Sequence, residues 1–572
     1  MNRWGRLGAL VAVVAASALL FFLAPPAPLQ VEVPSAWQDI AARTVGGAYH
    51  VHSTRSDGHG GRDQIAAAAA KAGLKFVIVT DHGDGARRPE APAYRQGVLV
   101  IDAVEISTDD GHVIALGIGR SPFPLGGEGR DVIEDIARLG GMSIVAHPGS
   151  KKPDLRWRDW ASRFGGLEWL NGDSEWRDET RLTLLRSLFT YPLRPVETLG
   201  QLLDRPDDVL RHWDSLAQRR RVVALAGSDA HARLALREAP EQYDGSAALR
   251  VPGYERMFET FSVVIPQLRL SGDAGQDTVR VIDEIRRGHV FSAIDALATP
   301  AAVVFSAASG SGHASGGDVL PLDGPVSLRV ASNAPGGSTI TLFKDGVPVA
   351  MSTQAALEFS ADPVPAVFRA EVGLGHAPGE PPVPWIITNP IYVGRSEQPP
   401  PADSRPPARA FTTIYDNGPV AAWQIEASTQ SAGAIDTARA EGGGTQLRWR
   451  YALGGTRSDG PYVALVVAAG PAVASADRVI FSARADKPMR LAMQVRVPRG
   501  AAGERWQRTF FVDEMPREIT VFFDDMRSRG EATTKLPAVP EIQALLWVVE
   551  PPNTPLGASG QVWLDNIRYG KP

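Results

Sequence analysis

Three side chains of the types that bind metal ions lie close together near the start of the chain. His50, His52 and Asp57 fall within AYHVHSTRSDGHG, residues 48–60, directly after a short apolar run. The chain of 572 residues has 11 histidines and no cysteine, which excludes disulfides, thiolate metal sites, iron–sulfur clusters and cysteine nucleophiles. A metal ion must therefore be held by imidazole and carboxylate groups, a donor set that suits Zn, Mn and Fe.

Five further candidate ligands each end or follow a segment with the composition of a β-strand. These segments are FVIV, VLVIDAV, SIVA and VVALAG, and the candidates at their ends are His82, Glu105, His147, Asp229 and His231. In a barrel-like α/β domain the C-terminal strand ends gather at one face, so residues far apart in sequence converge there. Because side chains alternate along a strand, we expect His50 and His52 to face the same way, and Asp229 and His231 likewise.

Each of these motifs alone is more often an ordinary polar strand or loop than a metal site. The combination is more specific, because several separate strand ends all finish in residues that bind the same metals. The sequence therefore predicts a metal centre. His59 and His212 lie outside this pattern and are interpreted as solvent or packing residues.

The elements that must position these residues lie between about residues 46 and 296. Short β-branched runs alternate there with helical patterns, as in YHVHS, RDQIAAAAAKAGL and KFVIVTDH, with DVIEDIARLG and DTVRVIDEIRRG further along. This alternation predicts a barrel-like α/β domain of about 250 residues.

After Pro300 the pattern changes to short alternating strands separated by Gly, Pro, Asp and Ser. Residues 301–395 are typical of a small, immunoglobulin-like β-sandwich, and residues 396–410, SEQPPPADSRPPARA, of an extended proline-rich linker. Residues 411–572 again contain only strand patterns and predict a jelly roll. The chain is thus expected to be multidomain, with one α/β domain followed by two all-β domains.

The first 30 residues predict export. Arg3 and Arg6 precede the apolar run LGALVAVVAASALLFFLA, whose 18 residues approach the length that spans a membrane. We expect a membrane anchor, or a signal peptide if the segment is cleaved, with the rest of the chain in the periplasm or outside the cell. The net charge of −5 argues against a nucleic-acid partner.

The motifs of the first domain, about residues 45–300, resemble those of the PHP family, the polymerase and histidinol phosphatase superfamily of metal-dependent phosphoesterases. HVHSTRSDG, VTDH, VEIS, AHP and GSDAH follow the family pattern in order. The resemblance implies a distorted (β/α)7 barrel and two or three divalent ions of Zn, Mn or Fe. The implied ligands are His50, His52, Asp57, His82, Glu105, His147, Asp229 and His231, with His112 of GHVIALGI as a further candidate ligand or phosphate contact.

The same resemblance implies hydrolysis of a phosphate ester, in which a metal-bridged hydroxide attacks phosphorus. We assign Glu105, Asp229 and His231 to the catalytic centre, with Glu105 as the bridging carboxylate. Arg55, Lys151 and Arg233 stand beside metal motifs and are candidate contacts for the phosphate of a small phosphorylated substrate.

The C-terminal domain suggests a second partner and two rival functions. Its closing VWLDNIRYG resembles the last strand of galactose-binding-like jelly rolls, which implies binding to surface glycan. Five tryptophans could stack on sugar rings, although tryptophan in a β-sandwich is more often part of the core: Trp423, Trp449, Trp506, Trp547 and Trp563. The rivals are a catalytically inactive glycan-binding protein and a metal-dependent amidohydrolase.

Overall fold

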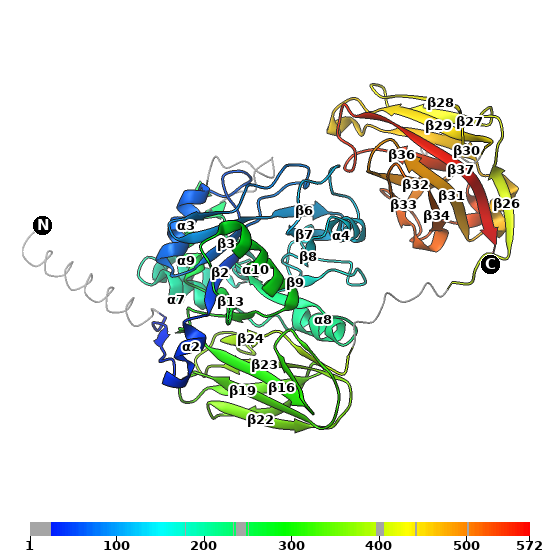
Figure 1. Ribbon diagram of the computed structural model, residues 1–572. Helices are drawn as coiled ribbons and strands as arrows, with labels where there is room; N and C mark the ends of the chain where they lie inside the picture. Colours follow the sequence, from blue (N-terminus) through cyan, green and yellow to red (C-terminus); the bar gives the residue numbers. More distant parts are fainter. Residues whose placement is uncertain are drawn as a thin grey trace, which may run out of the picture. The chain divides into compact units, whose positions relative to one another are not determined.

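The computed structural model describes residues 25–177, 179–232, 234–235, 248–249, 251–395, 405–440, 443–499 and 503–571. Contacts divide the chain into two units (Figure 1). Unit 1 comprises residues 1–84, 88–119 and 128–399, and unit 2 comprises residues 85–87, 120–127 and 400–572. The candidate metal ligands all belong to unit 1.

The first sheet of unit 1 begins with parallel strands built from apolar, largely β-branched residues. Strand β2 (Val45–Val51) pairs in parallel with β3 (Phe76–Val79), which pairs in parallel with β5 (Val98–Asp102). The crossover between β2 and β3 contains α3 (Arg62–Lys71), which buries Ile65 and Ala66 against the sheet. Strands that are buried on both faces of a parallel sheet have continuous apolar runs of this kind, and helices such as α3 connect them in βα units.

The second sheet of unit 1 has five strands in the order β10-β9-β8-β7-β6. Their bounds are Val223–Gly227, Gly166–Asn171, Met142–Val145, Gly111–Leu116 and Val104–Thr108, in that order. Two isolated bridges, Val51 to Ala230 and His82 to Glu105, connect it to the first sheet. The ends of β2, β3, β6 and β10 therefore lie side by side.

The other helices of unit 1 follow the strands or cover their faces. Their bounds are α2 Gln38–Ala41, α4 Gly129–Arg138, α5 Gly172–Glu175, α6 Arg181–Thr190, α7 Pro195–Gly200, α8 Asp207–Ala217, α9 Tyr254–Phe258 and α10 Ala274–Arg287. Helix α10 shows what defines the start and the end of such a helix. Asp273 accepts a hydrogen bond from the Gln276 N–H at its start, and Gly288 adopts the left-handed conformation at its end.

Several β-sandwich strands of unit 1 continue the first sheet, and the others form a separate four-stranded sheet. This sheet has twelve strands and runs β18-β25-β23-β24-β14-β13-β2-β3-β5-β4, with β20 and β21 joined at β23. The added strands are β4 Ala93–Arg95, β13 Ser262–Ile265, β14 Phe291–Ala293, β18 Val319–Leu320, β20 Thr339–Lys344, β21 Val347–Ser352, β23 Ala366–Gly373, β24 Ile386–Thr388 and β25 Ile391–Val393. The sheet thus crosses the boundary expected at residue 300.

Three smaller sheets complete the described strands of unit 1. The largest has the order β17-β16-β19-β22, with bounds Gly312–Ser315, Val303–Ser309, Val326–Ser332 and Ala356–Ala361. The second pairs β1 (Leu29–Gln30) with β15 (Ala298–Thr299). The third joins β11 (Leu234–Ala235) to β12 (Ala248–Leu249).

Unit 2 contains two antiparallel sheets that enclose one apolar core. The first sheet consists of β26 Ala410–Tyr415, β28 Ala432–Arg439, β29 Thr445–Ala452, β31 Arg478–Ala485, β34 Arg517–Phe522 and β37 Ser559–Lys571. The second consists of β27 Trp423–Ala427, β30 Val463–Ala468, β32 Met489–Val497, β33 Glu504–Val512, β35 Arg527–Ser528 and β36 Ala544–Val549. Because apolar and polar residues alternate along strands of this kind, each sheet buries one face against the other sheet.

The chain is therefore a multidomain, mostly β protein. Strands β6, β7 and β8 pair antiparallel, as do β13 and β2, so the strands of the first part do not form a uniformly parallel barrel. The distorted (β/α)7 arrangement stays a prediction. Among the described residues, no helix is long and apolar enough to cross a membrane, and most of the anchor expected over residues 1–30 falls outside them.

Candidate metal centre

His50 and His52 meet at the end of β2 through an irregular backbone. The β2–β3 register shifts between Tyr49 and Val51, and His50 has a positive φ of 65°. His52 lies one residue beyond the strand. Simple alternation along a strand therefore does not describe this pair, although their Nε2 atoms are only 3.1 Å apart. Such strained conformations persist where the surrounding structure fixes them, as at binding sites.

Two other predicted ligands share this backbone feature. His147, just after β8, has a φ of 32°, and Asp229, just after β10, has a φ of 47°. His231 follows Asp229 and its Nδ1 lies 2.8 Å from the Asp229 carbonyl oxygen. The strand ends thus turn sharply where the candidate ligands stand, which directs their side chains into one buried cluster.

Two carboxylate oxygens lie close to the imidazole nitrogens at the end of β2. His50 Nε2 lies 3.2 Å from Glu105 Oε2 and 3.3 Å from Asp229 Oδ1. His52 Nε2 lies at the same two distances from these oxygens, and 3.1 Å from His50 Nε2. Ligands about 2.0–2.1 Å from a tetrahedral zinc ion are separated by about 3.3 Å. These five distances are therefore of the size expected between ligands of a metal ion.

The second oxygen of Glu105 faces another group of imidazoles. Glu105 Oε1 lies 2.8 Å from His112 Nδ1 and 2.9 Å from His147 Nε2. His112 belongs to β7, opposite the Glu105 strand β6 in an antiparallel pair. The two oxygens of this buried carboxylate thus face different nitrogen groups, which is the arrangement of a carboxylate shared by two ions.

A third group of donors lies on the more open side of the cluster. Asp57 Oδ2 is 3.2 Å from His231 Nε2, and Asp57 Oδ1 is 3.8 Å from His82 Nε2. These side chains are 12–17% exposed, whereas those of His50 and His52 are fully buried. The structure brings all nine predicted ligands into one set of overlapping groups: His50, His52, Asp57, His82, Glu105, His112, His147, Asp229 and His231.

The mutual electrostatics of the cluster favour ionised carboxylates. Burial alone would raise the pKa of Glu105, but the imidazoles of His82, His50 and His112 bring it well below its ordinary value. Burial likewise opposes ionisation of Asp229, whose pKa is nevertheless lowered by His50 and His52. Burial lowers the pKa of His82 to about 4. Burial opposes the charged form of His52 as well, but Asp229 and Glu105 raise its pKa to about 10. Binding of a metal ion, which takes carboxylate and neutral imidazole, would therefore release protons from the cluster.

Glu168 is a functional residue that the sequence analysis missed. Its Oε1 lies 2.6 Å from His50 Nδ1, and its Oε2 accepts hydrogen bonds from the backbone N–H of His147 and from the Asn171 side chain, at 2.7 and 2.8 Å. A Cβ at Gly227 would overlap the Glu168 carboxylate, so glycine is required there. Glu168 holds Nδ1, so the His50 ring turns its Nε2 towards the cluster, where in the neutral ring this nitrogen would offer its lone pair to a metal ion. The signal in the sequence was Glu168 itself, a single charged residue inside the otherwise apolar strand segment LEWL.

Asp81 is the second residue that was missed. Its carboxylate accepts hydrogen bonds from the Ser53 backbone N–H at 2.7 Å, the Ser53 hydroxyl at 2.6 Å and the Ser56 hydroxyl at 2.9 Å. These contacts fix the loop after β2 that carries Asp57. Its position next to His82 in VTDH, directly after a buried strand, was the available signal.

The three candidate phosphate contacts have different surroundings. The guanidinium of Arg55 pairs with Asp102 at 3.5 Å and with Glu90. Lys151 lines a cavity that also reaches His147. Arg233 lies outside the described residues. Of the two excluded histidines, His212 stacks on Trp160 with ring centroids 4.0 Å apart, as expected of a packing residue, and the His59 backbone N–H donates to the His231 carbonyl.

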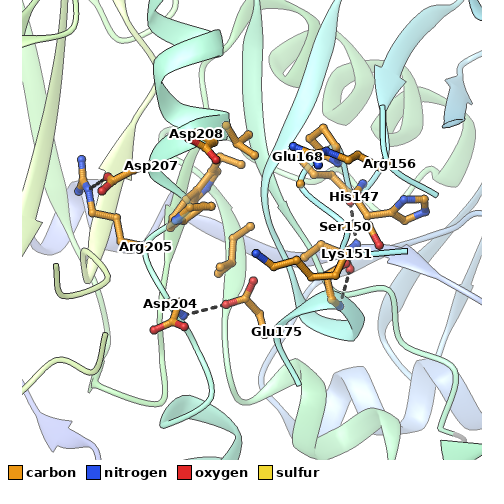
Figure 2. A pocket seen from close by; sticks show the side chains of 18 of the residues that line it. His147, Ser150, Lys151, Arg156, Glu168, Glu175, Asp204, Arg205, Asp207 and Asp208 are labelled. Atoms are coloured by element: carbon orange, nitrogen blue, oxygen red, sulfur yellow. Dashed lines mark hydrogen bonds and ion pairs between the residues drawn. The ribbon is translucent and has the colours of Figure 1, made fainter. Parts of the chain in front are cut away.

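The cavity beside the cluster has a volume of about 580 Å³. His147 and Glu168 form its inner wall, and Figure 2 shows the Lys151 and Glu175 side chains directed into the same space, opposite Arg205 and Asp207. Six acidic and three basic residues line it: Glu168, Glu175, Asp204, Asp207, Asp208, Glu380, Lys151, Arg156 and Arg205. Arg205 pairs with Asp207 at 2.7 Å, so the outer wall is predominantly acidic.

The tryptophans of unit 2 are mostly part of its core. Trp449, Trp506 and Trp547 are fully buried and Trp423 is 6% exposed. Trp563 is half-buried, and the guanidinium of Arg484 lies 3.8 Å from the centre of its ring. Four of the five candidate stacking residues therefore have packing roles, which is the more common role of tryptophan in a β-sandwich.

Comparisons with known proteins find similarity in solved structures alone. No family model matches the sequence, and no curated protein matches it. The solved structures include the family 11 carbohydrate-binding module of the cellulosomal cellulase Lic26A-Cel5E of Clostridium thermocellum, with 14% identity over 28% of this chain and 95% of that one, at a TM-score of 0.25. A family 30 module of a Clostridium thermocellum cellulase is 9% identical over 28% of this chain and 98% of that one, with a TM-score of 0.22.

Proposed function

We propose that this chain is an exported, metal-dependent phosphoesterase whose α/β part has the distorted (β/α)7 arrangement of the PHP family. The convergence of nine imidazole and carboxylate side chains around Glu105 carries the proposal. Its strongest element is the close approach of the His50 and His52 Nε2 atoms to each other and to oxygens of Glu105 and Asp229. Two or three ions of Zn, Mn or Fe suit this donor set.

The residues of the cluster have distinct tasks in this proposal. Such ions, when bound, make water a stronger nucleophile and neutralise charge on phosphoryl oxygens. Glu105 would hold two ions at a fixed separation, because its two oxygens face different imidazoles. Asp229 and His231 complete the catalytic centre, and the partly exposed Asp57, His82 and His231 form its more open side. Hydrolysis then needs no nucleophile from the protein.

The cavity of Figure 2 favours a particular class of phosphate ester. Lys151 supplies positive charge close to His147, where the phosphoryl group would lie. Carboxylates further out, including Glu175 and Asp204, accept hydrogen bonds and repel additional phosphates. We therefore favour a small monophosphate with a hydroxylated or amino-bearing leaving group, such as a sugar phosphate, over a nucleoside triphosphate or a nucleic-acid end.

The test uses the full chain in detergent. Bound metal is measured by elemental analysis, beside hydrolysis of p-nitrophenyl phosphate, bis-p-nitrophenyl phosphate and a panel of sugar phosphates and nucleotides. His52→Ala is compared with wild type, and His313→Ala, which alters an exposed histidine of the β-sandwich, serves as the matched control. We expect two or three equivalents of metal and phosphatase activity, both lost in His52→Ala and kept in His313→Ala.

Other outcomes would overturn the proposal in favour of a rival. A folded protein without metal would contradict the metal centre itself. Bound metal with hydrolysis of amides or carboxylic esters but not of phosphates would indicate an amidohydrolase. Bound metal without turnover of any substrate, together with binding to polysaccharide, would favour a glycan-binding protein. Unit 2 is the candidate for that role.

A further inference from the structure

An exposed apolar surface lies on α6 and the turn that follows it. Five large side chains within twelve residues are 51–77% exposed and form what we call the α6 patch: Leu182, Leu185, Leu188, Phe189 and Leu193. Among the described residues, 16 large apolar side chains are exposed, so nearly a third of them gather at this one place. Scattered exposed apolar residues are ordinary, whereas a contiguous patch marks an interaction surface.

The helix itself buries very little. Thr180 caps its start by accepting a hydrogen bond from the Thr183 N–H at 3.1 Å, and Pro192 follows its end. Of its ten residues only Thr190 is buried. Leu182, Leu185 and Phe189 lie along one stripe of the helix. Isolated helices of this length are marginal in water, because helical stability in proteins comes mostly from packing of an apolar face. Among the described residues, the five side chains of the patch therefore remain largely uncovered.

The patch lies beside the first described residues of the chain. The Arg194 guanidinium, next to Leu193, donates a hydrogen bond of 2.6 Å to the carbonyl of Pro25. Strand β1 then fixes the following residues against β15. In Figure 1 the first described residues lie on the same side of unit 1 as α7, the helix after this turn. In the sequence, Pro25 directly follows the 18-residue apolar run LGALVAVVAASALLFFLA, which lies outside the described residues.

The charges around the patch complement an anionic surface. The stretch TRLTLLRSLFTYPLRPV, residues 180–196, contains Arg181, Arg186 and Arg194 and no acidic residue. Leucine and phenylalanine on one face with arginines at its margins is the composition of helices that lie in the plane of a membrane interface. Basic residues near an anionic leaflet add electrostatic attraction to it.

We propose that the α6 patch lies in the interface of an anionic lipid bilayer, the same bilayer that the N-terminal apolar segment enters. Leu185 and its apolar neighbours would reach the acyl region, and Arg181 and Arg186 the lipid phosphates. Two contacts, the segment and the patch, would then hold unit 1 in one orientation at the membrane. This inference rests on the expected anchor and is independent of the chemistry of the metal centre.

The absence of cysteine makes a direct test possible with the full chain. A single Leu185→Cys variant is labelled with the environment-sensitive dye NBD and reconstituted into vesicles of phosphatidylglycerol and phosphatidylcholine that carry nitroxide-labelled acyl chains. Met351→Cys in β21 of the same unit, 69% exposed, is the matched control. We expect a blue-shifted emission and at least twofold quenching at residue 185, and neither at residue 351.

Equal quenching at residues 185 and 351 would overturn the proposal. A blue shift at residue 185 without quenching by lipid, accompanied by self-association in sedimentation, would overturn it in favour of a second copy of the chain as the occupant. Exchanging phosphatidylglycerol for phosphatidylcholine alone should weaken the quenching at residue 185, and unchanged quenching would contradict the role given to Arg181 and Arg186.

Discussion

The Nδ1 atom of His50 lies 2.6 Å from Oε1 of Glu168, and both side chains are fully buried. This contact joins residues 118 positions apart and fixes the orientation of the imidazole. As a result, His50 Nε2 is directed at Glu105 Oε2 and Asp229 Oδ1. A carboxylate behind a ligating histidine sets its tautomer and increases its basicity, so Glu168 is a positioning residue of the candidate metal centre.

Replacing Glu168 with glutamine should weaken metal binding without removing the ligands. We expect the affinity for zinc to fall by about 10- to 100-fold, because the neutral amide no longer stabilises the required His50 tautomer. Competition with a chelator at pH 7 measures this change. Glu358→Gln, at a side chain that is 79% exposed in β22, is the control. Equal affinities for the two variants would contradict the positioning role.

Replacing Glu105 with glutamine should have a larger effect than any other single change in the cluster. Its two oxygens contact both imidazole groups, so we expect the loss of at least one equivalent of metal by elemental analysis. The rate of p-nitrophenyl phosphate hydrolysis should fall on the order of a thousandfold, corresponding to several kcal/mol of transition-state stabilisation. Full metal content with full activity in Glu105→Gln would exclude a bridging carboxylate at this position.

Asp81 should act on one ion only. The loop that Asp81 holds through Ser53 and Ser56 carries Asp57 but not His50, Glu105 or Asp229. We therefore expect Asp81→Asn to lose the ion of the exposed group and to keep the others, as shown by a stepwise decrease in metal stoichiometry. Asp63→Asn, at a side chain that is 75% exposed, is the control. Loss of all metal, or of none, would contradict this division of the cluster.

The adjacent lysines 151 and 152 provide a matched pair for the cavity. Lys151 lines it and Lys152 does not. We expect Lys151→Met to raise KM for a sugar phosphate about tenfold, equivalent to about 1.4 kcal/mol of binding, while Lys152→Met leaves it within about twofold. Steady-state kinetics of both variants measure the difference. Similar KM values for the two would show that the substrate phosphate is held elsewhere.

His289 should make stability depend on pH. Its Nδ1 lies 2.7 Å from Glu284 and its Nε2 2.8 Å from Asp318, and the hydrogen bond with Asp318 raises its pKa despite the opposing effect of burial. The stabilisation is complete below the ordinary pKa of about 6.5 and is lost as pH rises through the raised value.

The His289→Gln variant should therefore melt a few degrees below wild type at pH 6, for a partly exposed interaction of about 1 kcal/mol, and at nearly the same temperature at pH 9. Scanning calorimetry at the two pH values tests this, with His313→Gln as the control. A difference in Tm that is independent of pH would show that packing, and not the charge of His289, is what the variant has lost.

Much of the candidate site follows from sequence because its residues are tied to strand ends. A buried apolar strand is evident from composition, and the C-terminal ends of such strands converge, so the order of residues along the chain is enough to group His82, Glu105 and His147. The seven side chains grouped in this way do lie in one cluster, and so do Asp57 and His112, which the PHP resemblance implied as ligands. The strand content of residues 301–395 and 411–572 was also evident, since alternation with Gly- and Pro-rich turns is a local pattern, although the continuation of the first sheet beyond residue 300 was not.

Other features depend on contacts between distant segments and could not be obtained locally. Glu168 can orient a ligand only because the His50 ring lies beside it in the folded chain. The pairing of Arg55 with Asp102 and Glu90 likewise depends on which segments of the chain meet. The register shift at His50 changes which way its side chain points, against the alternation expected of a regular strand. Burial of Trp449 and Trp547 was settled by the packing of two sheets.

The sequence by itself determined which donor atoms this protein has for a metal ion, because the absence of cysteine and the positions of the histidines are fixed by composition and order. The tertiary structure alone decided the distances among those atoms, the carboxylates that orient them, and the exposure of the α6 patch. Residue types set the chemistry that is available, whereas hydrogen bonds and packing between segments far apart in the chain set its geometry.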